Sequence, residues 1–331
     1  MNQQRLLLSG FGITSKAADV IQGIDLTGRT AIVTGGYSGL GRETVRILLA
    51  AGARVIVPSR DVPRARHAMA SIPGAEVEPM DLLEPDSIDA FASRFVSSGA
   101  PLHLLINSAG IMACPLMRDA RGFEYQFATN HLGHFQLTER LTPALVAARG
   151  ARVISVSSRG HWISPVDVED PNFKHRAYDP WLAYGQSKTA NILFATELDR
   201  RSASDGIRAF SLHPGAIVET GLAKYMTRDQ IRAAGGYDER DRPVVAPSRG
   251  LKSVEQGAAT IVWCAVSPSL DGLGGLYCED NDVASISEEG TGDSAPSVDA
   301  TSGGGVKPYA IDPGNARRLW ELSSRLLNLN S

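Results

Sequence analysis

Thr30-Ala31-Ile32-Val33-Thr34-Gly35-Gly36-Tyr37-Ser38-Gly39-Leu40-Gly41 is the stretch that decides the fold. Its first four residues predict a buried strand, and the apolar periodicity from Arg42 to Ala51 predicts a helix directly after the glycines. A strand, a glycine-rich turn and a helix leave backbone N–H groups free at the helix N-terminus, where they bind phosphate. Glycine is needed because a side chain would keep a diphosphate away from the backbone. We therefore expect a dinucleotide at this turn; the alternative is a glycine-rich turn without a ligand.

Strands and helices alternate along the rest of the chain, which predicts an α/β fold with a single doubly wound parallel sheet and helices on both faces. The further strands are expected at Arg54–Pro58, Ala75–Met80, Leu102–Ile106, Ala151–Ser157, Ile207–Leu212 and Gly275–Cys278. Residues 1–26 are expected to form an irregular arm with a short helix, and residues 27–331 a single domain. Within that domain we expect a mobile lid at about 216–252, a flexible loop at about 285–306 and a closing helix at about 312–329 that Asp312 and Pro313 begin.

Composition places the chain among ordinary globular proteins. It has 331 residues, of which 43% are hydrophobic and 21% charged, and a net charge of -3. This charge gives no reason to expect nucleic acid as a partner. Three widely spaced cysteines, no apolar run of about 18 residues and no signal-peptide core lead us to expect a cytoplasmic protein without a membrane anchor.

The residues after the second strand address the choice of cofactor. An acid at this position binds the ribose of NAD, whereas a basic residue accepts the 2′-phosphate of NADP. Here the sequence reads Ser59-Arg60-Asp61; Ser59 and Arg60 can bind a phosphate, and Arg42 is a second basic candidate. We expect Asp61 to cap the next helix, and we expect NADP rather than NAD. Asp81, at the end of the third strand, faces the ligand side or caps the helix that begins at Pro85.

Tyr184 and Lys188 lie four residues apart in a segment that favours helix, so both side chains can reach one site. A cation beside a tyrosine favours the phenolate and moves its pKa toward the range that acid-base catalysis needs. Asn130 is a misfit in the helix expected around Phe127–Phe135, and such misfits mark functional positions; a locally satisfied polar residue is the alternative. His131 and His134 in the same helix invite a metal interpretation, but no third ligand has suitable spacing, and we expect no metal.

Together these motifs, over roughly Leu26 to Tyr277, resemble the short-chain dehydrogenase/reductase (SDR) family, within it the retinol-dehydrogenase-like group, and imply a Rossmann-type domain. Thr34, Gly35, Gly39 and Gly41 match the TGxxxGxG cofactor turn, and Asn107 to Gly110 match the NNAG motif with Ser108 in place of the second Asn. The resemblance implies a catalytic tetrad of Asn130, Ser158, Tyr184 and Lys188, with Ser158 rather than Ser157 as its serine. It implies cofactor contacts from Thr34, Gly35, Tyr37, Ser38, Gly39, Leu40, Gly41, Ser59, Arg60, Asp81, Leu82, Asn107, Ala109, Gly110, Tyr184, Lys188, Pro214, Gly215 and Thr220.

The implied activity is NADP(H)-dependent oxidoreduction between a ketone or aldehyde and its alcohol, with NAD(H) as the lesser alternative. Tyr184 would be the acid or base, Ser158 would orient the substrate oxygen, Lys188 would hold the nicotinamide ribose, and Asn130 would anchor a water beside Lys188. An apolar pocket is expected from Ile111, Met112, Leu116, Trp162, Tyr225 and Met226, which suits a bulky small-molecule substrate. Family habit suggests a homodimer or homotetramer. The alternatives are a cofactor-binding sensor without turnover and, on the same fold, an epimerase or dehydratase.

Overall fold

The computed structural model describes residues 4–287 and 304–329, so most of the loop expected at 285–306 lies outside the described residues. Within the described chain the strands form one eight-stranded sheet in the order β3-β2-β1-β4-β5-β6-β7-β8. The strands are β1 Thr30–Val33, β2 Arg54–Ser59, β3 Ala75–Pro79, β4 Leu104–Asn107, β5 Ala151–Val156, β6 Ile207–His213, β7 Leu276–Glu279 and β8 Asp282–Val283. Neighbouring strands are parallel except β7 and β8, which are antiparallel. The doubly wound parallel sheet is confirmed, and the short β8 adds an antiparallel pair at its edge.

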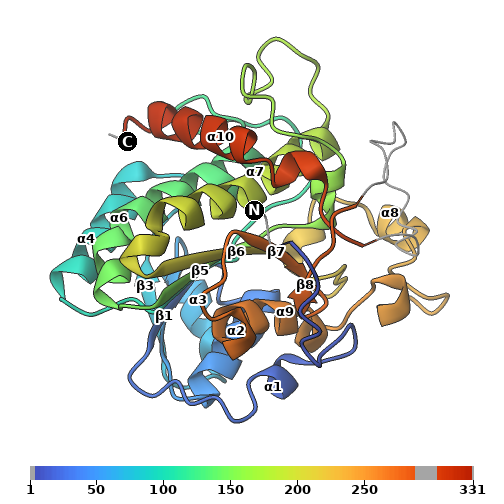
Figure 1. Cartoon of the computed structure of the whole chain (residues 1–331). Coiled ribbons are helices and arrows are strands. Elements are labelled where there is room, and N and C mark those ends of the chain that lie inside the picture. Colours follow the sequence, from blue (N-terminus) through green and yellow to red (C-terminus); the bar gives the residue numbers. More distant parts are fainter. Residues whose placement is uncertain (1–3, 288–303, 330–331) are drawn as a thin grey trace.

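Helices cover both faces of the sheet (Figure 1). Those described are α1 Ala17–Val20, α2 Gly39–Ala50, α3 Val62–Met69, α4 Pro85–Ser97, α5 Tyr125–Phe127, α6 Gly133–Ala147, α7 Pro180–Ser202, α8 Arg228–Ala233, α9 Val254–Val266 and α10 Pro313–Leu326. On one face α2 and α9 pack against the strands and α1 packs on these two helices; on the other face α4, α6 and α7 pack against the strands, with α10 lying over α7.

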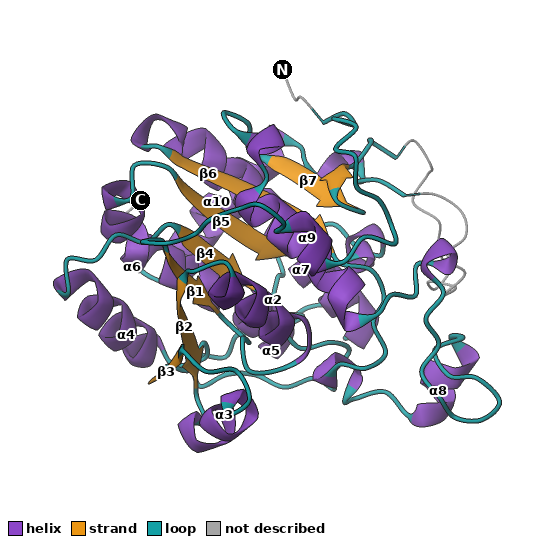
Figure 2. Ribbon diagram, turned by 90° about the horizontal axis from the view of Figure 1, so that it is seen from below, coloured by secondary structure: helices purple, strands orange, loops and turns teal. Residues whose placement is uncertain are grey.

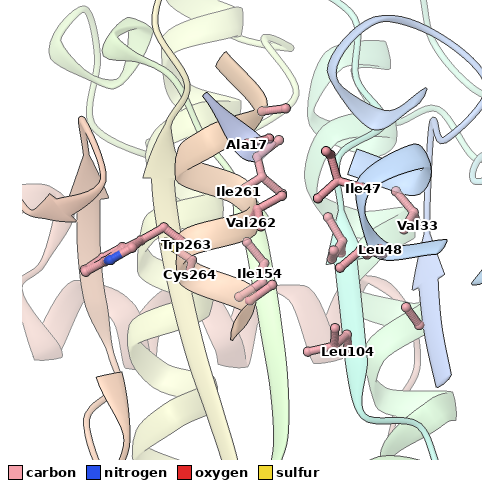
Figure 3. Close-up of a cluster of buried hydrophobic side chains, with 14 of the residues drawn as sticks. Ala17, Val33, Ile47, Leu48, Leu104, Ile154, Ile261, Val262, Trp263 and Cys264 are labelled. Atoms are coloured by element: carbon pink, nitrogen blue, oxygen red, sulfur yellow. The ribbon is translucent and has the colours of Figure 1, made fainter. Parts of the chain in front are cut away.

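The sheet is the centre of two hydrophobic cores because its central strands are buried on both sides. The strand residues Ala31, Ile32 and Val33 are each 0% exposed, as a parallel sheet between two helical layers requires. Figure 3 shows side chains of α2 and α9 gathered with the strand residues Leu104 and Ile154. The continuous apolar runs of the sequence thus become strands with no polar face.

The order of the strands creates the site. The chain leaves β3 at one edge and returns to the far side of β1 to form β4, so the connections after β1 and β4 turn away in opposite directions. A crevice opens outside the carboxyl ends of such a pair, and ligands bind there. The backbone N–H of Thr34 donates to the carbonyl of Ile106 at 3.0 Å, which holds the two strand ends together.

Two segments depart from the simple alternation of strands and helices. The helix expected through Phe127–Phe135 is divided into α5, a π-helical turn Ala128–Leu132 and α6. Residues 216–252 carry α8, which lies apart from the sheet (Figure 2), and the segment returns to the domain where Ala216 pairs with Leu251. Its behaviour as a lid remains a prediction.

The first described residues run along the last strands. The Gln4 amide donates to the carbonyls of Tyr277 and Ala284, each at 2.6 Å, and the backbone N–H of Leu7 donates to Asp282 at 2.8 Å. At the other end, Asp312 accepts a hydrogen bond from the Asn315 N–H and begins α10 as its sequence predicts.

Candidate active site

The glycine turn after β1 is packed too tightly for side chains. Gly35 has a φ of +67°, and a Cβ there would lie 3.0 Å from the Cα of Ala109. A Cβ on Gly41 would lie 2.4 Å from the Gly35 carbonyl oxygen. The turn therefore needs glycine both for its backbone conformation and for close approach.

The N-terminus of α2 fits a diphosphate. Ser38 is its N-cap residue, but the Ser38 side chain makes no capping hydrogen bond to the first turn. Unsatisfied N–H groups at the positive end of a helix form an anion site. The expected contacts Tyr37, Ser38 and Leu40 belong to this turn, so the residues present suit a dinucleotide cofactor.

The turn after β4 lies against the glycine turn. The Thr34 hydroxyl oxygen accepts hydrogen bonds from the backbone N–H groups of Ser108 at 2.9 Å and Ala109 at 3.0 Å. Asn107 is buried and donates to Thr138 at 3.3 Å, while its Oδ1 has no hydrogen-bond partner in the described structure. A Cβ on Gly110 would lie 3.2 Å from Asn130 Oδ1 and 3.6 Å from Lys188 Nζ, so Gly110 joins this turn to the tetrad.

Ser158 and Tyr184 are brought together at the carboxyl end of β5. Ser158 lies close enough to Tyr184 to lower the pKa of its hydroxyl, and the Ser158 oxygen accepts from the Gly160 N–H at 3.0 Å. Ser157 instead donates to the Lys188 carbonyl at 2.7 Å and is buried. A Cβ on Gly160 would lie 2.7 Å from the Tyr184 ring, so this glycine lets the 3₁₀ turn Arg159–Trp162 lie against the tyrosine.

Burial is the main cause of the pKa shifts of Tyr184 and Lys188. Burial raises the pKa of Tyr184 to about 12, although the hydrogen bond from Ser158 lowers it in part. Burial lowers the pKa of Lys188 to about 8, and its ammonium donates to the Val156 carbonyl at 3.0 Å. Lys188 Nζ lies 5.7 Å from the centre of the Tyr184 ring. Removal from water thus raises the Tyr184 pKa in this structure, opposite to the direction expected from the nearby cation.

Asn130 lies in the π-helical turn and ties two elements together. Its Oδ1 accepts from the Ile111 N–H at 2.9 Å, and its Nδ2 donates to the Ile111 carbonyl at 3.0 Å and to Ser187 at 2.9 Å. These bonds use both amide hydrogens and one of two oxygen lone pairs. The amide therefore fixes the segment after β4 against α7, next to Lys188.

The residues after β2 form a cluster of polar side chains on the side of the site where the adenosine part of a dinucleotide is expected. Burial alone would lower the pKa of Arg60, but its hydrogen bond to Tyr125 and the charge of Asp81 raise it. Ser59 bonds within the turn, and Asp61 caps α3 by accepting from the Arg64 N–H at 3.0 Å, as predicted. Leu82 lies under Gly133, where a Cβ would be 2.4 Å from the Leu82 carbonyl.

The second phosphate candidate and the alternative role of Asp81 are both corrected by the structure. Arg42 donates to the Ala68 carbonyl at 3.1 Å and to Ser71 at 2.7 Å, so it is bound to the end of α3 rather than offered to a phosphate. Asp81 does not cap α4, since Glu84 holds the N-cap position.

The segment after β6 approaches the glycine turn. Pro214 and Gly215 follow β6 directly, and Gly215 has a φ of +96° with Lys252 packed against it. The Thr220 methyl group would lie 3.1 Å from a Cβ on Gly39, so Thr220 sits beside the N-terminus of α2. The segment after β6 therefore lies beside the glycine turn of the expected cofactor site.

The expected substrate pocket is only partly assembled. The Trp162 indole donates to the Gly305 carbonyl at 3.1 Å, and the cations of Arg159 and Lys307 both lie over its ring, so Trp162 contacts the chain that follows residue 303. Met112 and Met226 are half-buried, and Tyr225 is 37% exposed. Two cavities of about 220 and 500 Å³ have linings that include none of these residues. The pocket remains a prediction.

Sequence reasoning missed one wall of the site. The Trp181 ring lies edge-on to the Tyr184 ring, with centroids 6.1 Å apart. The two positions are three apart on α7, a helical spacing that could have indicated the contact. The sequence does not show that Tyr178 bonds both the Cys114 carbonyl and Glu124, since these residues are far apart along the chain.

The described residues contain no group of three or more His, Cys, Asp or Glu side chains that could hold a metal ion. In the same parts of the chain, no helix is long and apolar enough to cross a membrane.

The glycine turn, the strand order and the serine–tyrosine–lysine group define a dinucleotide-dependent oxidoreductase, and comparison with known proteins identifies the family. The sequence model described as short chain dehydrogenase matches residues 29–231, more than half of the chain. The protein belongs to this family of oxidoreductases, which use NAD(H) or NADP(H).

Similar proteins match over nearly the whole chain. A protein of Streptomyces lividans named "Probable oxidoreductase" is 45% identical over 311 residues, which are 92% of this chain and 99% of that protein. Retinol dehydrogenase 11 of Mus musculus is 33% identical over 312 residues, 92% of this chain and 88% of that one. A solved structure of an uncharacterized protein from Mycobacterium paratuberculosis superimposes with a TM-score of 0.68 at 33% identity, covering 93% of this chain and 97% of that chain. The retinol-dehydrogenase-like resemblance is confirmed.

Proposed function

We propose that the protein is an NADP(H)-dependent carbonyl reductase and alcohol dehydrogenase, which interconverts a ketone or aldehyde and its alcohol. The proximity of Ser158 and Tyr184 supports this proposal best: a Cβ on Gly160 would lie 2.7 Å from the Tyr184 ring and 3.5 Å from the Ser158 hydroxyl oxygen. This arrangement brings two hydroxyl-bearing side chains to one place, where both can bind the oxygen of a substrate. When bound, the nicotinamide nucleotide supplies or accepts the hydride.

Tyr184 acts as the acid in reduction and as the base in oxidation. In reduction it donates its proton to the substrate oxygen as negative charge develops there, and Ser158 donates a hydrogen bond that orients the same oxygen. Lys188 keeps a positive charge beside the tyrosine at neutral pH, because its pKa is about 8. That charge favours the phenolate that forms when the proton leaves. Asn130 positions the backbone beside Lys188 and keeps one oxygen lone pair for the expected water.

Arg60 supports NADP(H) over NAD(H). Arg60 directly follows β2, and the end of this strand is where a dinucleotide fold presents the ribose 2′ position. A guanidinium binds a phosphate with paired, charge-assisted hydrogen bonds. We also propose a bulky, apolar substrate, since the Trp181 ring lies edge-on to the Tyr184 ring with centroids 6.1 Å apart.

The test is cofactor consumption by the purified protein with NADPH and, in parallel, NADH. The substrate panel contains aldehydes, aliphatic ketones and bulky aryl or polycyclic ketones. We expect turnover that prefers NADPH and rises with the apolar bulk of the ketone.

Tyr184→Phe separates catalysis from binding. This variant should lose at least about 100-fold in turnover, the usual contribution of a general acid, and still bind NADPH. Carbonyl turnover at the parent rate in this variant would show that Tyr184 is not the acid. Tight NADPH binding by the parent protein with no turnover in either direction would favour a sensor instead.

A further inference from the structure

His134 connects the cofactor turn to the tetrad, and none of the roles above uses it. It is the second residue of α6 and is fully buried. Its Nε2 lies 2.8 Å from the Thr34 hydroxyl oxygen, and its Nδ1 lies 3.0 Å from the main-chain carbonyl oxygen of Asn130. One imidazole thus spans from the end of β1 to the π-helical turn that carries Asn130.

The neighbouring bonds determine which ring nitrogen carries the proton. The Thr34 oxygen has two lone pairs, and both accept backbone N–H groups, from Ser108 and Ala109. The remaining Thr34 hydrogen can point to His134 Nε2 at 2.8 Å or to the Ile106 carbonyl at 3.4 Å, and the shorter contact is the better hydrogen bond. His134 Nε2 is then the acceptor, which leaves the proton on Nδ1 to donate to Asn130.

The imidazole is neutral, as this arrangement requires. Burial lowers the pKa of His134 to about 4; the bond to the Asn130 carbonyl raises it in part, and the charge of Lys188 lowers it further. A neutral imidazole has one donor and one acceptor, and both are used here. All the bonds therefore run in one direction, from the Ser108 and Ala109 N–H groups through Thr34 and His134 to Asn130.

We propose that His134 is a positioning residue that couples the cofactor turn to the catalytic helix, holding Thr34 with one ring nitrogen and the Asn130 carbonyl with the other. Thr34 fixes the two turns between which the dinucleotide binds. Asn130 fixes Ile111 and, through Ser187, the helix that carries Tyr184 and Lys188. Loss of His134 therefore removes one hydrogen bond that holds Thr34 and one that holds the Asn130 carbonyl. Its effect on turnover rests on the proposed function, whereas its effect on cofactor affinity does not.

Three substitutions separate the two ends. His134→Phe keeps the bulk and removes both hydrogen bonds. The amide nitrogen of His134→Asn can replace Nδ1 but does not reach Thr34, whereas the longer His134→Gln reaches Thr34 and gives up the bond to Asn130. Each variant is measured for the Kd of NADPH by fluorescence titration, for kcat per cofactor-binding site, and for Tm.

We expect a crossed pattern. His134→Phe should weaken NADPH binding and lower kcat, each by about 10-fold, the size of one lost hydrogen bond. His134→Asn should restore most of kcat but not the affinity, and His134→Gln should restore most of the affinity but not kcat. If the phenylalanine variant does not fold, the opposite behaviour of the Asn and Gln variants carries the test.

His131 provides a matched control. It is a buried histidine three residues earlier whose Nε2 lies 2.7 Å from the Ser323 hydroxyl of α10, away from the cofactor turn. His131→Phe should lower Tm and leave Kd and kcat at the parent values. If His134→Phe behaves like His131→Phe, His134 is only a packing residue and the proposal is wrong. If the parent protein has no turnover, the proposed function fails, and the affinities alone decide the role of His134.

Discussion

Two buried lysines differ in whether a carboxylate neutralises their charge. Lys252 is buried and its ammonium lies 2.5 Å from Asp280. Lys188 is also buried, yet no carboxylate pairs with it in the described part of the chain, and its ammonium donates to the Val156 carbonyl. A buried, unpaired charge costs stability, and such residues are retained where function needs them. The buried charge of Lys188 therefore lowers the stability of the fold, and we infer that it is retained for the function of the site.

Lys188→Met should stabilise the protein at pH 7. The side chains have similar volume, and the Val156 carbonyl keeps a bond from Asn191 at 3.1 Å. The pKa of Lys188 falls from 10.5 to about 8 in the fold, so between these values the unfolded chain binds more protons and stability rises with pH. The penalty is complete below about pH 8. We expect the variant to gain about 1–3 kcal/mol at pH 7, with the gain shrinking toward pH 10.5.

Urea unfolding of parent and variant at pH 7 and pH 9.5 measures this difference. Lys252→Met is the control, because it breaks an ion pair and should destabilise. A loss of stability in Lys188→Met as large as that in Lys252→Met would show that the Lys188 charge is well solvated in the fold.

Arg60→Ala should change the choice between cofactors. Loss of a charge-assisted bond to a phosphate costs about 1.5–3 kcal/mol, so the Kd of NADPH should rise about 10- to 100-fold while that of NADH stays nearly constant. Arg42→Ala is the matched control, since Arg42 is bound to Ala68 and Ser71 and should not affect the preference. Equal losses for both cofactors in Arg60→Ala would refute the assignment of NADP(H).

At the scale of elements, the helical segment that carries Asn130 depends on its first residue. Glu124 is fully buried and caps α5 by accepting from the N–H groups of Gln126 at 3.0 Å and Phe127 at 2.7 Å. It also accepts from the Tyr178 hydroxyl at 3.2 Å, and burial raises the pKa of its carboxyl. One side chain thus joins the start of α5 to the segment before α7.

Glu124→Ala should destabilise the protein by about 2–4 kcal/mol, because it leaves two buried backbone N–H groups without their acceptor. Glu84 is the matched control: it is exposed and holds the N-cap position of α4 without a side-chain bond. Glu84→Ala should stay within about 0.5 kcal/mol of the parent. Denaturant titrations compare the two; equal effects would mean that the buried cap contributes nothing specific.

Elements whose cause is local were predictable, and those whose cause is tertiary were not. The strand ending at Val33 and the cap at Asp61 follow from neighbouring residues, and the structure places both as expected. The π-helical turn at Ala128–Leu132 did not follow, since Asn130 reveals a misfit but not the bonds to Ile111 and Ser187 that accompany it. The positions of Tyr184 and Lys188 followed from helical spacing, but the rise in the pKa of Tyr184 depends on burial by distant segments. The hydrogen bond from Arg42 to Ser71 is also a tertiary contact, so the position of Arg42 after the glycines did not predict it.

At the scale of the whole molecule, α10 closes the outer helical layer. It lies over α7 (Figure 1), far from α1 and α9 on the opposite face. Trp320 provides the contact: its ring stacks on Phe194 with centroids 6.0 Å apart and meets Phe135 edge-on at 4.7 Å. The Arg201 guanidinium covers the same ring at 4.7 Å. The last helix therefore covers aromatic side chains of α6 and α7 that would otherwise face solvent.

Trp320→Ala should lower the free energy of unfolding by about 3–5 kcal/mol, the range for removing a buried aromatic side chain. Because Phe135 and Phe194 lose their cover, the variant should also associate as its concentration rises, which sedimentation velocity measures. Arg317→Ala, an exposed substitution on the same helix, should change neither property. Turnover per folded molecule should stay near the parent value, since Trp320 contacts α7 at Phe194, beyond Tyr184 and Lys188. A monomeric Trp320→Ala of parent stability would show that α10 is not needed to close this face, and a loss of turnover in a folded variant would show that it also supports the site.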